Sequence, residues 1–141
     1  MPVYYSNSEN ETFALGELLA KKLNKDSCVA LFGGMGMGKT VLVRGLCAGM
    51  GYDGEVTSPT FAIVHEYRGG RLPVFHFDMY RVDSWDGLYS TGFFEYMDEG
   101  VTVTEWSENI EGALPDNAIK VIISPWENYN SRKIEMLGLD L

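Results

Sequence analysis

A glycine-rich segment from Gly33 to Thr40 matches the phosphate-loop pattern G-x-x-x-x-G-K-[ST]. In such a loop, glycines let consecutive backbone N–H groups turn towards phosphate oxygens, and the following helix directs its positive end at the same oxygens. The lysine reaches the β- and γ-phosphates, and the hydroxyl of the last residue binds Mg²⁺. The pattern predicts a Mg-nucleotide site whose nucleotide contacts come from Gly33, Gly36, Met37, Gly38, Lys39, Thr40 and Val41.

The sequence around this loop supports the interpretation. The apolar run Cys28–Phe32 directly before it is typical of a buried strand, and an apolar face at helical spacing follows from Lys39 to Met50. A glycine-rich turn in an unrelated fold is the alternative, and this strand, loop and helix order disfavours it. A guanine-reading Asn-Lys-x-Asp element would come well after the loop, whereas Asn24-Lys25-Asp26 precedes it. We therefore expect ATP.

Two carboxylates are placed where they could complete the site. Asp78 closes the apolar run that begins at Val74, and Glu105 closes the run that begins at Val101. A lone acidic residue at a strand end often only faces solvent, but two of them beside a phosphate loop favour binding of Mg²⁺ and orientation of an attacking water. The candidate catalytic residues are Lys39, Asp78 and Glu105.

Other polar and aromatic residues permit two interpretations each. Ser58-Pro59-Thr60 is either a switch near the γ-phosphate or a simple turn. His65 and His76 lie inside strand patterns, where hydrogen-bonded sheet histidines are commoner than proton-transfer groups. Trp106 is a platform for the site or a core residue, and the sequence favours the core.

The elements that must position these residues follow from periodicity and turn signals. Ser8-Glu9-Asn10-Glu11 is a capping box, so a first helix is expected over about Glu9 to Leu23. The order of elements predicts an α/β fold of the P-loop NTPase type, with a mostly parallel central sheet, antiparallel additions and few helices. The other expected elements are a β-hairpin of Phe61–Tyr67 and Leu72–Tyr80, an irregular or helical stretch Ser84–Glu99, and strands Val101–Trp106, Ala118–Ser124 and Arg132–Leu139.

Composition limits the class of protein. A chain of 141 residues with 45% hydrophobic content is expected to form one domain over residues 1–141. A net charge of -9 argues against a surface that grips a phosphate backbone by itself, so any nucleic acid is expected to be held by a partner. Cys28 and Cys47 lack metal-ligand spacing and are expected to be buried. Without a leader or a long apolar run, a cytoplasmic protein that does not contact a membrane is expected.

Motifs along nearly the whole chain resemble the TsaE family, also called YjeE, the small ATPase of bacterial tRNA threonylcarbamoyladenosine biosynthesis. The diagnostic segments follow the phosphate loop. They are Ser58-Pro59-Thr60-Phe61, His76-Phe77-Asp78-Met79-Tyr80-Arg81, Glu105-Trp106-Ser107 and Leu114-Pro115. Glu11-Thr12 and Leu15-Gly16 in the first helix also match.

The resemblance implies roles for individual residues. It implies that Thr40 and Glu105 bind Mg²⁺, that Asp78 is important for activity, and that Ser58-Pro59-Thr60 is the switch. Thr12 and Arg132 are implied on the adenine side of the nucleotide. Tyr80, Arg81 and Trp106 belong to the same motifs and are candidates for further functional residues. The family's usual loop, Gly-Asp/Glu-Leu-Gly-Ala-Gly-Lys-Thr, differs at Gly34, Met35 and Met37.

The function implied by the resemblance is ATP binding and hydrolysis in partnership with TsaD and TsaB, which transfer a threonylcarbamoyl group to the adenosine beside the anticodon. The chain itself would not perform the transfer, and tRNA would reach it only through the complex. Two alternatives remain open: a small-metabolite kinase, which would need a basic lid, and a nucleotide-bound regulatory module without useful turnover.

Overall fold

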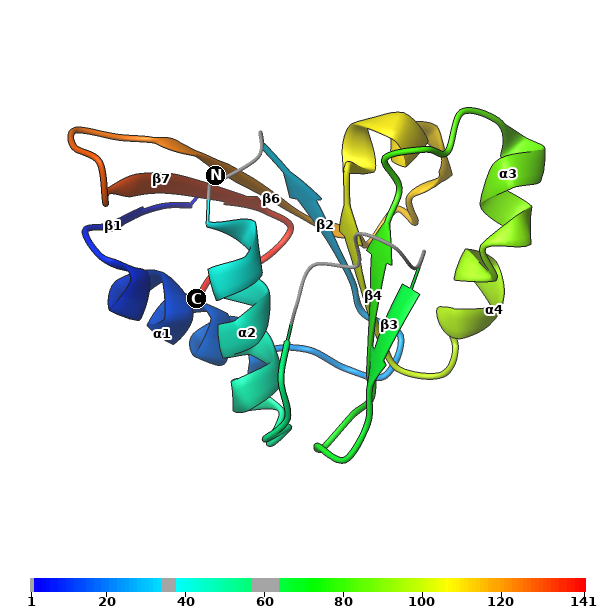
Figure 1. The fold of residues 1–141 in the computed structure, drawn as a ribbon, viewed down its shortest axis with the longest axis horizontal. Coiled ribbons are helices and arrows are strands. Elements are labelled where there is room, and N and C mark those ends of the chain that lie inside the picture. Colours follow the sequence, from blue (N-terminus) through cyan, green and yellow to red (C-terminus); the bar gives the residue numbers. More distant parts are fainter. Residues whose placement is uncertain (1, 34–37, 57–63) are drawn as a thin grey trace.

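The computed structural model of the chain describes residues 2–33, 38–56 and 64–141. These residues form one seven-stranded sheet with helices on both of its faces (Figure 1). The elements in chain order are β1 (Val3–Ser6), α1 (Glu9–Ala20), β2 (Cys28–Phe32), α2 (Lys39–Gly49), β3 (Val64–Tyr67), β4 (Val74–Asp78), α3 (Trp85–Ser90), α4 (Phe93–Tyr96), β5 (Val101–Glu105), the 3-10 helix η1 (Ser107–Ala113), β6 (Ile119–Pro125) and β7 (Arg132–Leu137).

The strands lie in the order β1-β7-β6-β2-β5-β4-β3. The four central strands, β6, β2, β5 and β4, pair in parallel, whereas β1, β7 and β3 add antiparallel pairs at the two sides. The expected fold, a parallel centre with antiparallel additions and few helices, is therefore confirmed. The expected hairpin is confirmed for β3 and β4, with His65 opposite His76, whereas residues 61–63 of its expected first strand lie outside the described residues. In the described part of the chain, no helix is long and apolar enough to cross a membrane.

Alternation along the strands sends side chains to two separate cores, because successive residues of a strand point to opposite faces. Val29 and Leu31 of β2 pack with α1 and α2, whereas Cys28 packs with Phe77 and α4 residue Phe93 in the second cluster. The sheet thus separates an α1–α2 layer from a layer of α3, α4 and η1, as Figure 1 shows. Continuous apolar runs such as β2 are explained by this cover on both faces.

Two glycines allow α1 and α2 to pack closely. A β-carbon on Gly16 would collide with the Leu42 carbonyl of α2, and one on Gly45 would collide with the Phe13 carbonyl of α1. Ser8 caps α1 by accepting a hydrogen bond from the Glu11 N–H, as the capping box predicts. The α1–α2 layer therefore depends on small residues that let backbones approach, in addition to its apolar face.

Several boundaries differ from the sequence-based expectation. The first helix ends at Ala20 rather than Leu23, and β5 ends at Glu105, so Trp106 lies outside the strand. Strand β1 and the 3-10 helix η1 were not expected. Because β1 is only four residues long and pairs with β7 at the other end of the chain, local patterning gave little sign of it.

Candidate nucleotide and metal site

The candidate site lies at one edge of the sheet, where the parallel strands β2, β4 and β5 end and α2 begins. Asp78 and Glu105 are the last residues of β4 and β5 and are register partners. Ligands of open α/β sheets bind outside the carboxyl ends of the strands for the same geometric reason: loops and helix N-termini meet there. The fold therefore brings both predicted carboxylates to the phosphate-loop edge.

The two described glycines of the loop adopt conformations that only glycine tolerates well. Gly33 has φ of 133°, and a β-carbon there would lie 2.5 Å from the Ile123 carbonyl oxygen. Gly38 has φ of 91° and is the N-cap of α2. Because Gly38 has no side chain, it makes no side-chain capping bond to the first turn of α2. The N–H groups of that turn are suited to an anion. The predicted contacts Gly36 and Met37 lie outside the described residues.

Lys39 is buried, with 6% of its surface exposed, although lysine is rarely buried without partners. Its Nζ donates to the Gly33 carbonyl oxygen at 3.0 Å and lies 3.8 Å from Glu105 Oε1. The ammonium also lies 5.3 Å from the centroid of the Trp106 ring. These contacts hold a positive charge at the start of α2, between the phosphate loop and the end of β5.

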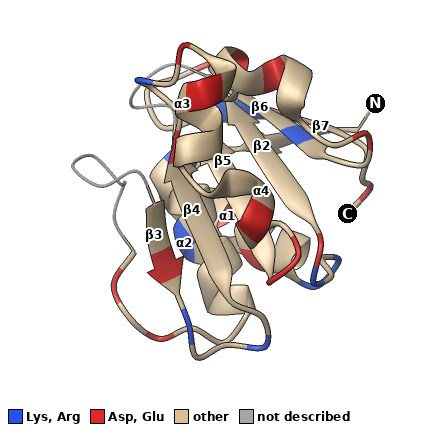
Figure 2. Ribbon diagram, turned by 90° about the vertical axis from the view of Figure 1, so that its right-hand side faces the viewer, with Lys and Arg blue, Asp and Glu red and all other residues tan. Residues whose placement is uncertain are grey.

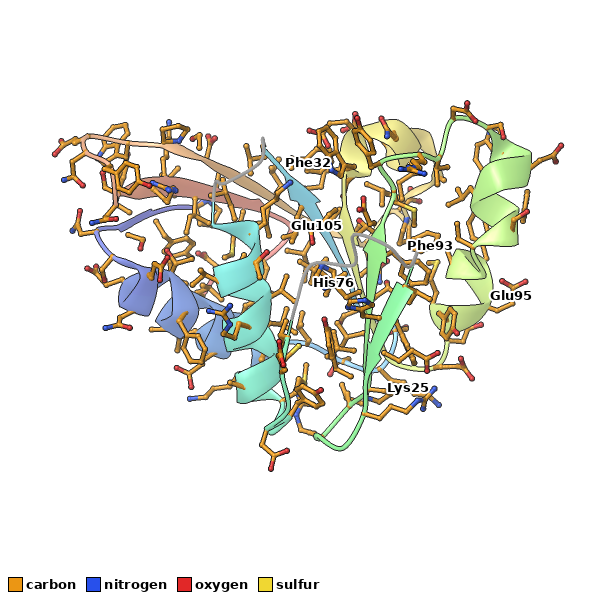
Figure 3. The ribbon with its side chains drawn as sticks, viewed as in Figure 1. Lys25, Phe32, His76, Phe93, Glu95 and Glu105 are labelled. Carbon is orange, nitrogen blue, oxygen red and sulfur yellow. The ribbon has the colours of Figure 1, made fainter. Side chains whose placement is uncertain are left out.

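Glu105 is held from the other side by His76. His76 Nε2 and Glu105 Oε2 are 2.5 Å apart, and the histidine is fully buried (Figure 3). Because an ionised carboxylate can only accept, Nε2 is the nitrogen that donates, whereas Nδ1 has no hydrogen-bond partner among the described residues. The Glu105 carboxylate therefore lies between His76 and Lys39. His76, on strand β4, orients it.

His76 is the main site residue that the sequence reasoning missed, because it favoured an ordinary sheet histidine. A signal was available in the alternation of β4. His76 and Asp78 are two residues apart and so point to the same face as Val74, which packs in the α1–α2 core. That face is the one from which Lys39 approaches, so the His-x-Asp spacing directs both side chains at the site.

Asp78 lies at the rim of the site and is half-buried. Its Oδ1 accepts a hydrogen bond from the Tyr80 N–H at 2.9 Å, which holds the turn after β4. The Tyr80 side chain is exposed, and its ring centroid lies 4.9 Å from that of Trp106. Arg81 is exposed. The rim therefore combines one carboxylate with an aromatic pair.

Trp106 was expected in the core, but it is half-buried beside the site. Its φ of 58° is the one positive value among the described non-glycine residues. This conformation turns the chain sharply after Glu105 and sets the indole between Lys39 and Tyr80. Trp106 is thus partly buried against the second core cluster and also contacts the site, so it agrees in part with each of the two interpretations.

Thr12 and Arg132 come together at the other side of the loop. A β-carbon added to Gly38 would lie 3.9 Å from Arg132 Nε and 4.0 Å from Thr12 Cγ2. The Thr12 hydroxyl is paired with the Ser6 hydroxyl at 2.7 Å, so its methyl group faces Gly38. The β1–β7 pairing sets Ser6 opposite Arg132 and thereby joins the two ends of the chain beside α2.

Thr40 and Val41 are half-buried in the first turn of α2. The Thr40 hydroxyl and the Glu105 carboxylate are oxygen donors of the kind that Mg²⁺ prefers. With the glycine-lined start of α2 and the Lys39 ammonium, this donor set fits a nucleotide phosphate with its metal ion. The proposed switch, Ser58-Pro59-Thr60, lies outside the described residues.

Both cysteines are buried, as expected. Burial raises the pKa of the Cys47 thiol to about 12 and raises that of Cys28 as well, although a hydrogen bond with Thr102 partly opposes the second shift. Neither thiol is therefore in a reactive form near neutral pH.

Comparisons with known proteins agree with the geometry. A sequence profile described as threonylcarbamoyl adenosine biosynthesis protein TsaE matches residues 6–134. The chain is 41% identical over 105 residues to the tRNA threonylcarbamoyladenosine biosynthesis protein TsaE of Synechocystis, covering 72% of this chain and 67% of that protein. It is 36% identical over 117 residues to the protein of the same name from Treponema pallidum, covering 82% and 86%. The crystal structure of YdiB from Bacillus subtilis superposes with a TM-score of 0.81 at 30% identity, covering 94% of this chain and 82% of that one.

Proposed function

Since this chain belongs to the TsaE family of tRNA threonylcarbamoyladenosine biosynthesis, we propose that it binds ATP with Mg²⁺ and hydrolyses it while acting with TsaD and TsaB. One observation carries the nucleotide part of the proposal. The buried Lys39 ammonium lies at the start of α2, 3.8 Å from the Glu105 carboxylate, which His76 holds in turn.

This arrangement resolves a problem of burial. A buried ammonium or carboxylate is costly unless it is paired, and each of these two groups has the other as a partner. An arriving phosphate would offer Lys39 a stronger anionic partner, and the first-turn N–H groups of α2 would donate to the same oxygens. Pairing with Glu105 therefore keeps the Lys39 ammonium charged and available to bind phosphate.

Each residue then has a defined task. Lys39 would contact the β- and γ-phosphates, Thr40 and Glu105 would hold Mg²⁺, and Asp78 would orient the attacking water. When bound, Mg²⁺ would neutralise charge on the phosphate oxygens. Thr12 and Arg132, which flank Gly38, would contact the adenine side of the nucleotide. A cationic group that would stabilise the leaving phosphate is not evident from the motifs, so slow turnover of the isolated chain is expected.

The acidic character of the chain supports a division of labour with its partners. With a net charge of -9, the chain would repel a tRNA backbone, and TsaD and TsaB would hold the tRNA instead. The transfer of the threonylcarbamoyl group would be theirs, whereas this chain would contribute ATP turnover.

The test is phosphate release at saturating ATP, measured for the chain alone and with TsaD and TsaB. We expect release to rise with the partners, and we expect Asp78→Ala to abolish the rise with a smaller effect on ATP affinity. Equal rates with and without the partners would favour a nucleotide-bound regulatory module. Transfer of phosphate to a small metabolite, in place of release, would favour a kinase.

A further inference from the structure

Exposed aromatic side chains cluster on the helices that cover the sheet face opposite α1 and α2. Trp85 and Tyr89 of α3 are 57% and 58% exposed. Their ring centroids are 6.4 Å apart, and Tyr89 lies 5.0 Å from Phe94 of α4. Phe94 in turn contacts Phe93, which is fully buried. We call Trp85, Tyr89 and Phe94 the α3–α4 face; Trp85 and Tyr89 are exposed, whereas Phe94 is half-buried and anchors them on the core.

A cavity of about 210 Å³ lies next to this face, between α3 and η1. Val82, Trp85 and Leu88 line one side of it, and Asn109, Ile110 and Ala113 line the other. The Asn109 amide donates to the carbonyl oxygens of Met79 and Tyr80, so hydrogen bonds join η1 to the loop before α3. An apolar side chain from a partner would find here both a recess and two flat aromatic surfaces, the usual parts of a protein interface.

The segment that builds the α3–α4 face carries charge of one sign. Residues 82–119 contain nine of the 20 acidic residues and none of the 11 basic ones, so the rest of the chain holds 11 of each. Eight of the nine are exposed, and the ninth is Glu105 in the nucleotide site. In Figure 2, α3 and α4 carry red and no blue. The whole net charge of -9 therefore comes from the segment that builds this face.

The negative charge limits the kind of partner that could bind the α3–α4 face. Nucleic acids and anionic lipid surfaces are repelled by exposed carboxylates. On this face a metal site is not indicated, because the described residues contain no group of three or more His, Cys, Asp and Glu side chains that could hold an ion. A protein surface with Lys and Arg around an apolar side chain matches both the charge and the aromatic surfaces.

We propose that the α3–α4 face is the docking surface for a basic protein partner, which inserts an apolar side chain beside Trp85 and pairs Lys or Arg with the surrounding carboxylates. The inference rests on the proposed function only in taking TsaD and TsaB as the proteins to test. The face lies on the layer opposite α1 and α2, so docking there leaves the α1–α2 layer uncovered.

The first experiment measures binding of TsaD and TsaB to the full chain by biolayer interferometry. Trp85→Ala combined with Tyr89→Ala should weaken binding about 30-fold or more, as expected when aromatic anchors are removed. Tyr129→Ala is the matched control, because Tyr129 is exposed (90%) and lies outside the face, between β6 and β7. ATP affinity, measured on the same samples, should stay unchanged for all of these variants and shows that they are folded.

The second experiment tests the charge. Asp83→Lys combined with Glu95→Lys, both exposed and near the face (Figure 3 labels Glu95 on α4), should weaken binding about tenfold at low salt and less at high salt. Asp26→Lys combined with Asp53→Lys makes the same change in net charge at exposed positions outside the segment. That control should bind like the unmodified chain.

Each outcome decides the proposal. Loss of binding in both face variants and not in their controls supports it. Unchanged binding in the face variants overturns it while the proposed partnership stands. No binding of the unmodified chain to TsaD and TsaB overturns the partnership, and the docking surface with it. Binding of tRNA or of anionic vesicles that Trp85→Ala with Tyr89→Ala abolishes would also overturn it.

Discussion

Two regions of this chain use carboxylates under opposite conditions. At the nucleotide edge, Glu105 is 5% exposed and is held between His76 and Lys39. Around the α3–α4 face, eight acidic side chains are exposed, and Glu111 is the one for which an ion pair with a lysine, Lys120, is seen among the described residues. The effect of a buried carboxylate depends on its exact partners, because leaving a buried charge unpaired is costly. Exposed carboxylates instead act together, through the electrostatic potential that they produce at the surface.

This difference predicts which substitutions should have large effects on binding and which should have moderate, salt-dependent effects. Changes within the buried group should alter nucleotide or metal binding by large factors and should depend on one another. Changes on the face should alter partner binding, respond to salt and leave the nucleotide site intact.

The largest effect is expected for Lys39→Ala. The substitution removes a buried charge that contacts the Gly33 carbonyl and lies next to Glu105, so ATP affinity should fall by about 100-fold or more. Titration calorimetry with Mg-ATP measures the change. Lys25→Ala is the control, since Lys25 is exposed and lies far from the site (Figure 3). Unchanged affinity of the Lys39 variant would remove the basis of the phosphate-loop assignment.

A smaller effect is expected for His76→Phe, which deletes the donor that orients Glu105. Loss of such an orienting partner should weaken Mg²⁺ binding in the presence of nucleotide by about 10- to 100-fold. His76→Gln retains an N–H donor and should recover part of the loss. The readout is the Mg²⁺ concentration that half-saturates nucleotide binding, with circular dichroism as the folding control. Equal defects in both variants would indicate a packing role for His76.

Thr40→Ala and Glu105→Gln should combine less than additively, because both are proposed to hold the same ion. A coupling energy of about 0.5–3 kcal/mol in a double-mutant cycle is expected for groups that share a partner. The cycle is measured on ATP affinity at fixed Mg²⁺. Strict additivity would show that the two residues serve separate sites.

The smallest effect is expected for the reactivity of cysteine thiols, which should differ between the interior and the surface. Because the pKa of Cys47 is raised to about 12 and that of Cys28 is also raised, neither thiol should react with iodoacetamide at pH 8 in the folded chain. Tyr89→Cys, on the α3–α4 face, should react within minutes.

The raised pKa values of Cys28 and Cys47 should also lower the free energy of unfolding as pH rises from about 9 towards 12, since the thiols ionise first in the unfolded chain. Mass spectrometry and denaturant titrations check the two statements, and rapid labelling of the unmodified chain would contradict the burial of its cysteines.

The sequence by itself determined the parts whose signals are local. The phosphate loop, the strand Cys28–Phe32 before it and the helix after it follow from glycine spacing and periodicity, as does the Ser8 cap. The placement of Asp78 and Glu105 at one edge was also predictable, because parallel strands bring their carboxyl ends together. The sequence also contains the acidic run of residues 82–119, although the sequence analysis used only the net charge of the whole chain.

Tertiary structure decided the contacts between distant segments. The hydrogen bond of His76 with Glu105 joins residues 29 positions apart and needs the parallel pairing of β4 and β5. The approach of Arg132 to Gly38 needs β1 to pair with β7, which no local period encodes. The left-handed turn at Trp106 is a conformation that surrounding contacts must hold. The helices α3 and α4 likewise became one acidic, aromatic face only through packing, because their short segments carry little periodicity of their own.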